Sequence, residues 1–303
     1  MKKVLFIGAM IALSTACKTV IVEPDTPTQS QSQTPVETGE IMPDDNTPTK
    51  KFTFTVKGDF GQDIKTKGYL NADGKDMTDL WVLDYMDGTL VQQLHQSDNS
   101  AEDFGKPVMQ LKYGAHHIYF VASRGQNPVL STTDKTVTFS KVLDTFWQDY
   151  EVNVVNTSNG NRAVTLDRVV TRLKLTFTDA IPEGTATFNT TPDTWYYGIN
   201  YQTGAPCAAK TSTAVVVDVP SNMIGSAGET LNLYGFSTAS EWTTNVTVAA
   251  KKSSGDILGS ATITGVKLLR NRTTEYSGAL FLQGGEVGLT LNTDWTTPVI
   301  GTW

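Results

Sequence analysis

The chain has 303 residues, of which 39% are hydrophobic, 18% charged and 9% aromatic, and its formal net charge is -7. Disordered chains carry fewer aromatic residues and nucleic-acid binders concentrate positive charge, so the composition disfavours both classes. The length predicts one or two domains. Two cysteines cannot form a disulfide framework or a four-cysteine zinc site. The composition therefore indicates an exported, acidic and mainly β protein.

Residues 1–16 are predicted to be a lipoprotein signal peptide. Lys2 and Lys3 precede an apolar run, 4–13, that would span about 15 Å as a helix, half of a bilayer core. Small residues then lead to Cys17, an order typical of a secretory signal. We expect Cys17 to carry lipid, because several acyl chains at about 0.8 kcal/mol per CH₂ hold a protein on a membrane. Ordinary cleavage after Ala16 is the alternative, and it would leave a free thiol.

Residues 17–50 are predicted to be the lipidated cysteine followed by a disordered tether. The stretch from Thr26 to Pro35 is polar and repetitive, and Pro43 and Pro48 continue it. Such a segment buries too little apolar surface to offset its ordering entropy. The tether would hold a folded body away from a membrane.

From Lys51 onward, apolar residues recur mainly at every second position, which predicts half-buried strands. The Asp87-Gly88 step predicts a tight hairpin between strands 80–85 and 89–91. A second hairpin is expected around Gly114-Ala115, and Asn159-Gly160 predicts a further turn. The other predicted strands cover 52–56, 109–113, 117–122, 150–155, 196–199, 214–219, 230–236, 245–250, 261–269, 276–282 and 287–291.

The segment from Val169 to Thr178 alternates most clearly, and we expect an antiparallel strand with one wet face. A short helix is possible over 140–147. Strands at this spacing, separated by turn residues, predict sandwiches rather than βαβ units. We therefore predict an all-β protein with two antiparallel β-sandwich domains, 51–165 and 166–303, after the signal peptide and tether.

Catalytic and metal-binding patterns are weak. His116 and His117 are neighbours on a predicted strand and point to opposite faces, so they cannot share one metal ion. His95 is expected near a polar loop, and Cys207 in a loop without a visible base. The segment 71–76 is expected to be a plain turn rather than a calcium loop. We predict no catalytic residue, no metal site and no cofactor.

Two other classes of function stay open from the residue types. Carboxylate pairs such as Asp84 with Asp87, or Glu102 with Asp103, could serve glycoside hydrolysis, although 31 acidic residues produce such pairs by chance. Tryptophans could line a sugar-binding platform, although such residues more often fill the core of a sandwich. The tryptophans considered for this role are Trp81, Trp147, Trp195 and Trp242.

Four stretches of the chain resemble the FimB-type minor subunits that accompany type V (fimbrillin) pili. They are Met77 to Gly88, Tyr113 to Phe120, Leu166 to Leu173 and Asn271 to Gly278. Together with the lipoprotein-like start, the resemblance covers nearly the whole chain. It implies two transthyretin-like sandwich domains in a lipid-anchored subunit at the base of a pilus.

The resemblance also implies partners. Subunits of this family join other fimbrial (pilin) subunits by strand exchange, in which one chain's strand completes another's open sheet. Major pilins lose their first strand to an arginine-specific protease, and no arginine precedes Arg124 here. That departure favours an anchor that keeps its lipid.

We therefore predict an outer-membrane, surface-exposed fimbrial anchor that may limit pilus length, held by lipid on Cys17, without a nucleic-acid or small-molecule partner. A surface glycan-binding lipoprotein is the alternative. The C-terminal stretch from Thr297 to Trp303 is expected to be a closing strand of its own domain or a contact segment.

Overall fold

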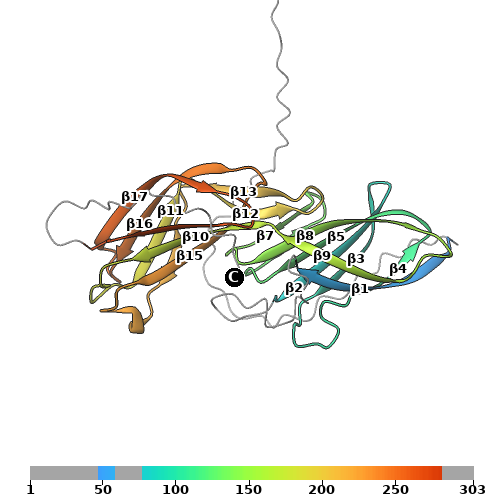
Figure 1. Ribbon diagram of the computed structural model, residues 1–303, viewed down its shortest axis with the longest axis horizontal. Coiled ribbons are helices and arrows are strands. Elements are labelled where there is room, and N and C mark those ends of the chain that lie inside the picture. The colour runs from blue at the N-terminus through green and yellow to red at the C-terminus, as the bar shows by residue number, and fades with distance from the viewer. Residues whose placement is uncertain (1–46, 59–76, 282–303) are drawn as a thin grey trace, which may run out of the picture.

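The computed structural model describes residues 47–58 and 77–281. These residues form a succession of β-strands (Figure 1). Their alternating apolar and polar residues place every second side chain in a core. The first nine strands are β1 (Thr49–Gly58), β2 (Asp79–Met86), β3 (Thr89–Gln96), β4 (Val108–Lys112), β5 (Gly114–Ser123), β6 (Val129–Ser131), β7 (Thr136–Thr138), β8 (Thr145–Val154) and β9 (Asn161–Arg168). The others are β10 (Val170–Phe177), β11 (Thr187–Pro192), β12 (Thr194–Asn200), β13 (Ala205–Thr211), β14 (Val215–Asp218), β15 (Glu229–Phe236), β16 (Trp242–Lys251), β17 (Ile257–Leu268) and β18 (Thr273–Gly278), with a 3₁₀ turn, η2 (Ser221–Met223), between β14 and β15.

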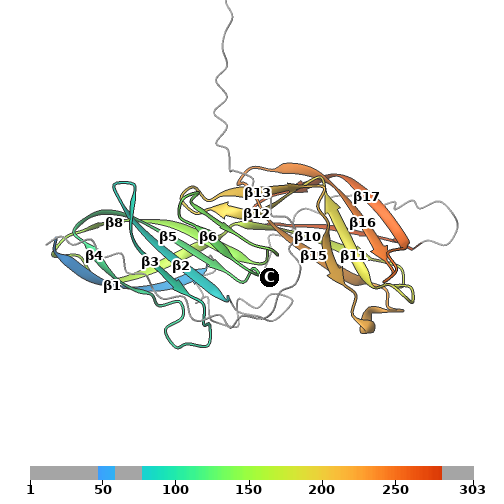
Figure 2. The same cartoon turned by 180° about the vertical axis from the view of Figure 1, so that it is seen from behind.

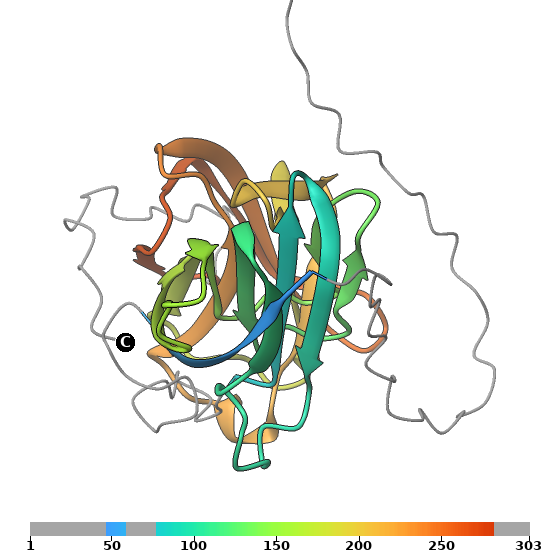
Figure 3. The ribbon, with the colours of Figure 1, turned by 90° about the vertical axis from the view of Figure 1, so that its right-hand side faces the viewer.

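The N-terminal part is a seven-stranded sheet in the order β3-β2-β5-β8-β9-β1-β4. Seen end-on, its strands curl around an enclosed core (Figure 3). Phe54 of β1 lies edge-on to Phe120 of β5, with ring centroids 5.3 Å apart, and both side chains are buried. Contacts of this kind, across the curled sheet, form one core.

The C-terminal part has two facing sheets, β15-β10-β18 and β14-β11-β16-β17. Leu173, Leu175 and Phe177 of β10 are buried between them, as their alternation predicts. β10 is not wholly antiparallel, however: it pairs antiparallel with β15 and parallel with β18. The expectation of a purely antiparallel strand is therefore wrong, because alternation reports burial and not the direction of a neighbour.

A fourth sheet, β13-β12-β7-β6, ties the two parts together (Figure 2). Its β6 and β7 precede β8 in the chain, yet β7 pairs with β12. The hydroxyls of Tyr85 and Tyr201 lie 2.7 Å apart at this junction, and the Lys135 ammonium donates to Tyr85 at 3.1 Å. The division into modules at 51–165 and 166–303 stays a prediction.

The all-β sandwich fold is confirmed, and so is the Asp87-Gly88 hairpin, where both residues have positive φ, 47° and 74°. The hairpin expected around Gly114 is wrong, because β4 pairs with β1 while β5 pairs with β2 and β8. No helix forms over 140–147, where irregular chain leads into β8. Cys207 lies buried in β13 rather than in a loop.

Several expectations fall outside the described residues. These are the signal peptide, the lipid on Cys17, the tether up to residue 46, the 71–76 turn, the 287–291 strand and the stretch from Thr297 to Trp303. None of the residues that the structure describes forms a helix with the length and apolar character needed to span a bilayer.

Candidate interaction site

β15 lies at the edge of its three-stranded sheet and forms one wall of the candidate site. Just beyond the β10–β15 ladder, the amide of Ser237 donates to the carbonyl of Val169 at 3.3 Å. Because antiparallel partners alternate, the odd-numbered residues of β15 bond to β10 through their backbone groups. The backbone groups of Thr230, Asn232 and Tyr234 therefore face away from β10, along the open edge.

β14 is the edge of the facing four-stranded sheet and forms the opposite wall. The amide of Val219 donates to the carbonyl of Ala186 at 2.9 Å, which sets the alternation of β14 against β11. Val217 packs against the core, while the side chain of Val216 is turned outward and 55% exposed. The open edges of the two C-terminal sheets thus border one cavity.

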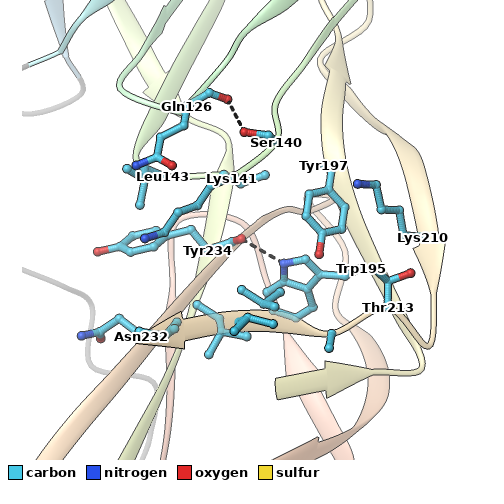
Figure 4. Close-up of a pocket in the computed structure, with 16 residues that line it drawn as sticks. Gln126, Ser140, Lys141, Leu143, Trp195, Tyr197, Lys210, Thr213, Asn232 and Tyr234 are labelled. Carbon is cyan, nitrogen blue, oxygen red and sulfur yellow. Dashed lines mark hydrogen bonds between the residues drawn. The ribbon is translucent and has the colours of Figure 1, made fainter. Parts of the chain in front are cut away.

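The cavity has a volume of about 290 Å³. β12 contributes its aromatic side chains, and the irregular chain before β8 closes one side (Figure 4). The walls are of mixed polarity. Apolar side chains come from Val142, Leu143, Trp195, Val215, Val217 and Leu233, and polar or charged ones from Gln126, Ser140, Lys141, Lys210, Thr213 and Asn232.

Polar groups stand at defined points around the cavity. The Trp195 indole donates to the carbonyl of Tyr234 at 2.9 Å and so covers one end of the β15 edge. Tyr197 is 5% exposed, and its burial raises the pKa of the hydroxyl above the usual value, so it stays a neutral donor. The ammonium of Lys210 lies 4.3 Å from the Tyr197 ring centroid. Figure 4 shows these side chains together, with Lys141 on the opposite side.

His116 lies apart from the cavity, in the N-terminal sheet, and its side chain is buried near the start of β5. Its Nδ1 lies 2.7 Å from Asp84, and its Nε2 donates to the carbonyl of Lys112 at 2.8 Å. Burial alone lowers the pKa of His116, but the hydrogen bond with Asp84, the charge of Asp84 and the carbonyl of Lys112 together raise it. Burial also raises the pKa of Asp84, against the effect of His116. Because both side chains are sealed from solvent, the pair holds a proton in the core and cannot meet a substrate.

The other two histidines form ordinary surface contacts. His95 lies 2.8 Å from Asp79 and stacks on Trp81. His117 lies on the face opposite to His116, as predicted, and its Nδ1 lies 3.3 Å from Asp149 and 3.9 Å from Glu151. These three groups could in principle share a cation. The His117 side chain is half exposed, so an ion pair accounts for the geometry.

The carboxylates expected for a hydrolase are not assembled. Asp84 is buried against His116, whereas Asp87 is an exposed residue of the hairpin turn. Glu102 and Asp103 are exposed in the loop before β4. None of these four side chains lines the cavity described above.

The four tryptophans considered for a sugar platform serve the fold. Trp81 and Trp195 are buried, and the other two are partly buried. Trp147 donates to the carbonyl of Tyr201 at 2.6 Å, and Trp242 donates to the hydroxyl of Ser237 at 2.9 Å. None of the four presents an open ring face together with a free indole N–H.

Sequence reasoning missed the cavity itself. The strands that carry Tyr197, Val217 and Asn232 were predicted, but β11 and β13 were not. Which strands lie at sheet edges depends on pairings between distant segments, and alternation along one strand contains no signal for them.

No protein-family model matches the sequence, and no curated protein matches it. Two solved structures from Bacteroides ovatus, described provisionally as adhesins, align with TM-scores of 0.50. One is 13% identical over 76% of this chain and 88% of its own, and the other is 12% identical over 84% and 94%. The fimbrial anchor protein of Porphyromonas gingivalis is 8% identical over 80% of this chain and 95% of its own, with a TM-score of 0.42. Fimbrial proteins are thus among the solved structures similar to this chain, and the first two matches show a shared fold.

Proposed function

We propose that this chain is a structural, non-catalytic subunit of a cell-surface fimbrium, anchored in the outer membrane by lipid on Cys17. In this proposal it attaches the pilus and joins other subunits by β-strand complementation. The observation that carries it is the fold shared with two provisionally described adhesins. Among the residues that the structure describes, no strand pairs with the outer edge of β15, and this supports the mode of assembly, because an open edge can accept a strand from another chain.

The lipid anchor is supported by the order of charged, apolar and small residues before Cys17. The test is to express the full chain in a Gram-negative host, fractionate the cells and measure the mass of the mature N-terminus. We expect diacylglyceryl on Cys17 and recovery in the outer membrane, whereas Cys17→Ala should move to the soluble fraction. Cys207→Ala is the matched control, since that thiol is buried in β13 and should not affect fractionation.

Attachment to a fimbrium is tested by affinity purification of the full chain from membranes of its native cells. Fimbrial subunits should co-purify with the wild-type chain and stay associated after the membrane is dissolved. An unmodified Cys17, or a chain that never recovers another fimbrial subunit, contradicts the proposal.

A further inference from the structure

We infer that His117, Asp149 and Glu151 form a zinc-binding site on the outer face of the N-terminal sheet. One ligand atom from each side chain lies within 4.8 Å of the other two. Without a metal ion the three groups form the ion pair described above. None of them lines the cavity between β14 and β15, so the inference does not depend on the proposed function.

The pairing of β5 with β8 brings the three side chains together (Figure 1). In this antiparallel ladder His117 lies opposite Glu151, and Tyr119 lies opposite Asp149. Because side chains in a strand alternate between faces, these four residues share one face of the sheet, and the buried His116 lies on the other. The ligands are therefore held by two strands of regular structure rather than by a loop.

The spacing of His117 and Asp149 differs from that of a hydrogen-bonded pair. Nδ1 of His117 lies 3.3 and 3.4 Å from the two carboxylate oxygens of Asp149. For the aspartate partners of His116 and His95, the corresponding distances are 2.7 and 2.8 Å. Charge-assisted hydrogen bonds measure about 2.7–2.9 Å, so the contact at His117 is a loose one.

The same spacing fits two ligands of one zinc ion. Zinc binds imidazole nitrogen and carboxylate oxygen at about 2.0–2.2 Å, which places tetrahedral ligands about 3.3–3.6 Å from one another. Oε1 of Glu151 lies 3.9 Å from Nδ1 of His117, and its side chain is 74% exposed, so a small rotation completes the set. An imidazole among the ligands favours Zn²⁺ over Mg²⁺ or Ca²⁺, which prefer oxygen donors. Water takes the fourth position, on the solvent side.

The charges and the packing at this point also favour a bound cation. Asp149 and Glu151 are two positions apart on one face of β8, and among the described residues neither forms an ion pair with a lysine or arginine. A divalent cation removes their mutual repulsion. Tyr119 is 7% exposed, and its ring stacks on that of His117 with centroids 6.2 Å apart and planes 19° apart. This contact holds the imidazole in place, as the neighbours of metal ligands commonly do.

The test is a calorimetric titration of the purified chain with zinc chloride. The protein begins at residue 17, carries Cys17→Ala so that no terminal thiol competes, and has no polyhistidine tag. We expect saturable binding of one zinc ion per chain and a melting temperature about 5–10 °C higher when free zinc is about 100 times Kd. Magnesium chloride should produce neither effect. Failure of zinc to bind saturably overturns the inference.

Variants locate the site. His117→Gln and Glu151→Gln should each bind zinc at least about tenfold more weakly. His95→Gln is the matched control for the first, because His95 also lies beside an aspartate, and Glu102→Gln, in an exposed loop, is the control for the second. Both controls should bind zinc as the wild type does. Equal affinity for zinc in all five proteins overturns the assignment to these residues.

Melting in the absence of zinc separates lost ligands from lost structure. His117 and Glu151 are exposed, so their variants should melt at the wild-type temperature without zinc and lose only the increase that zinc causes. If His117→Gln already melts lower without zinc, Glu151→Gln decides the question, because its side chain is the most exposed of the three. An undiminished rise in the melting temperature of Glu151→Gln with zinc contradicts the site.

Discussion

Arg168 offers a quantitative test of how the N-terminal sheet is joined to β10. Its guanidinium makes two hydrogen bonds to the carboxylate of Asp144, at 2.7 and 3.1 Å, and a third to the side chain of Asn271 at 3.0 Å. It also lies 4.8 Å from the ring of Phe146. Both members of the ion pair are only 3% exposed. Removal of either charge therefore leaves the other buried without an opposite charge in this ion pair.

The expected cost follows from this burial. Breaking a buried, hydrogen-bonded ion pair from one side costs about 3–5 kcal/mol, because the remaining charge keeps its desolvation penalty. For a folded body of this size, each kcal/mol lowers the melting temperature by about 2–4 °C. Asp144→Asn and Arg168→Met should each lower it by roughly 6–20 °C. The combination Asp144→Leu/Arg168→Met should recover much of that loss, because an apolar pair carries no desolvation penalty.

The assay is urea and thermal unfolding of the purified mature chain, followed by tryptophan fluorescence. The ion pair between Lys174 and Glu275 is the matched control, since its atoms lie 2.8 Å apart but the side chains are 30% and 40% exposed. Glu275→Gln should cost at most about 1 kcal/mol. The reasoning is refuted if Asp144→Asn costs no more than Glu275→Gln, or if Asp144→Leu/Arg168→Met loses as much stability as Asp144→Leu and Arg168→Met, measured singly, lose together.

Two further tests probe the core and the turns. Burial raises the pKa of Asp84 despite His116, and for His116 the partners outweigh burial and raise the pKa above 6.5. The folded state therefore binds more protons than the unfolded state, and stability should fall as pH rises above about 6.5. His116→Gln should flatten that fall in the urea midpoint, and parallel wild-type and variant profiles would count against the shared proton. Gly235→Ala places a Cβ 2.6 Å from Trp195, so it should lower stability by about 1–3 kcal/mol and shift the tryptophan emission. Gly88 has a φ of +74° and nothing within 4 Å of an added Cβ. Gly88→Ala should therefore lower stability by about 1–2 kcal/mol through backbone strain and leave the emission unchanged. Identical emission from the two glycine variants would contradict the contact at Trp195.

Local signals were sufficient for most of the strands. The alternation from Val170 to Phe177 predicted which face of β10 is buried, because side chains in a strand change sides at every residue. The Asp87-Gly88 turn was also predicted from a local signal, since both central residues of such a turn need positive φ, which Asp and Gly tolerate. β6, β7, β9, β11 and β13 escaped notice. β6 and β7 are three residues long, and β13 carries small and polar residues, so these three have too little apolar contrast.

Pairings between distant segments could not be predicted in this way. β1 lies between β4 and β9, antiparallel to β4 and parallel to β9, and its own alternation contains no signal for either pairing. The Gly114 turn has the residues of a hairpin, but its φ of 134° instead redirects the chain from β4 to a strand beside β2. The same limit applies to the candidate site. Lys141 and Lys210 are far apart in the sequence, and only the packing of the sheets places them on one cavity.

An open strand edge is a hazard as well as a binding surface, because it can pair with any exposed strand. The edge of β15 lies inside a cavity, with Trp195 bonded over one end and the chain at Val142 and Leu143 on one side. A whole sheet cannot approach an edge enclosed in this way, but a single extended segment can. The enclosure therefore favours pairing with one extended segment over indiscriminate pairing with exposed sheets.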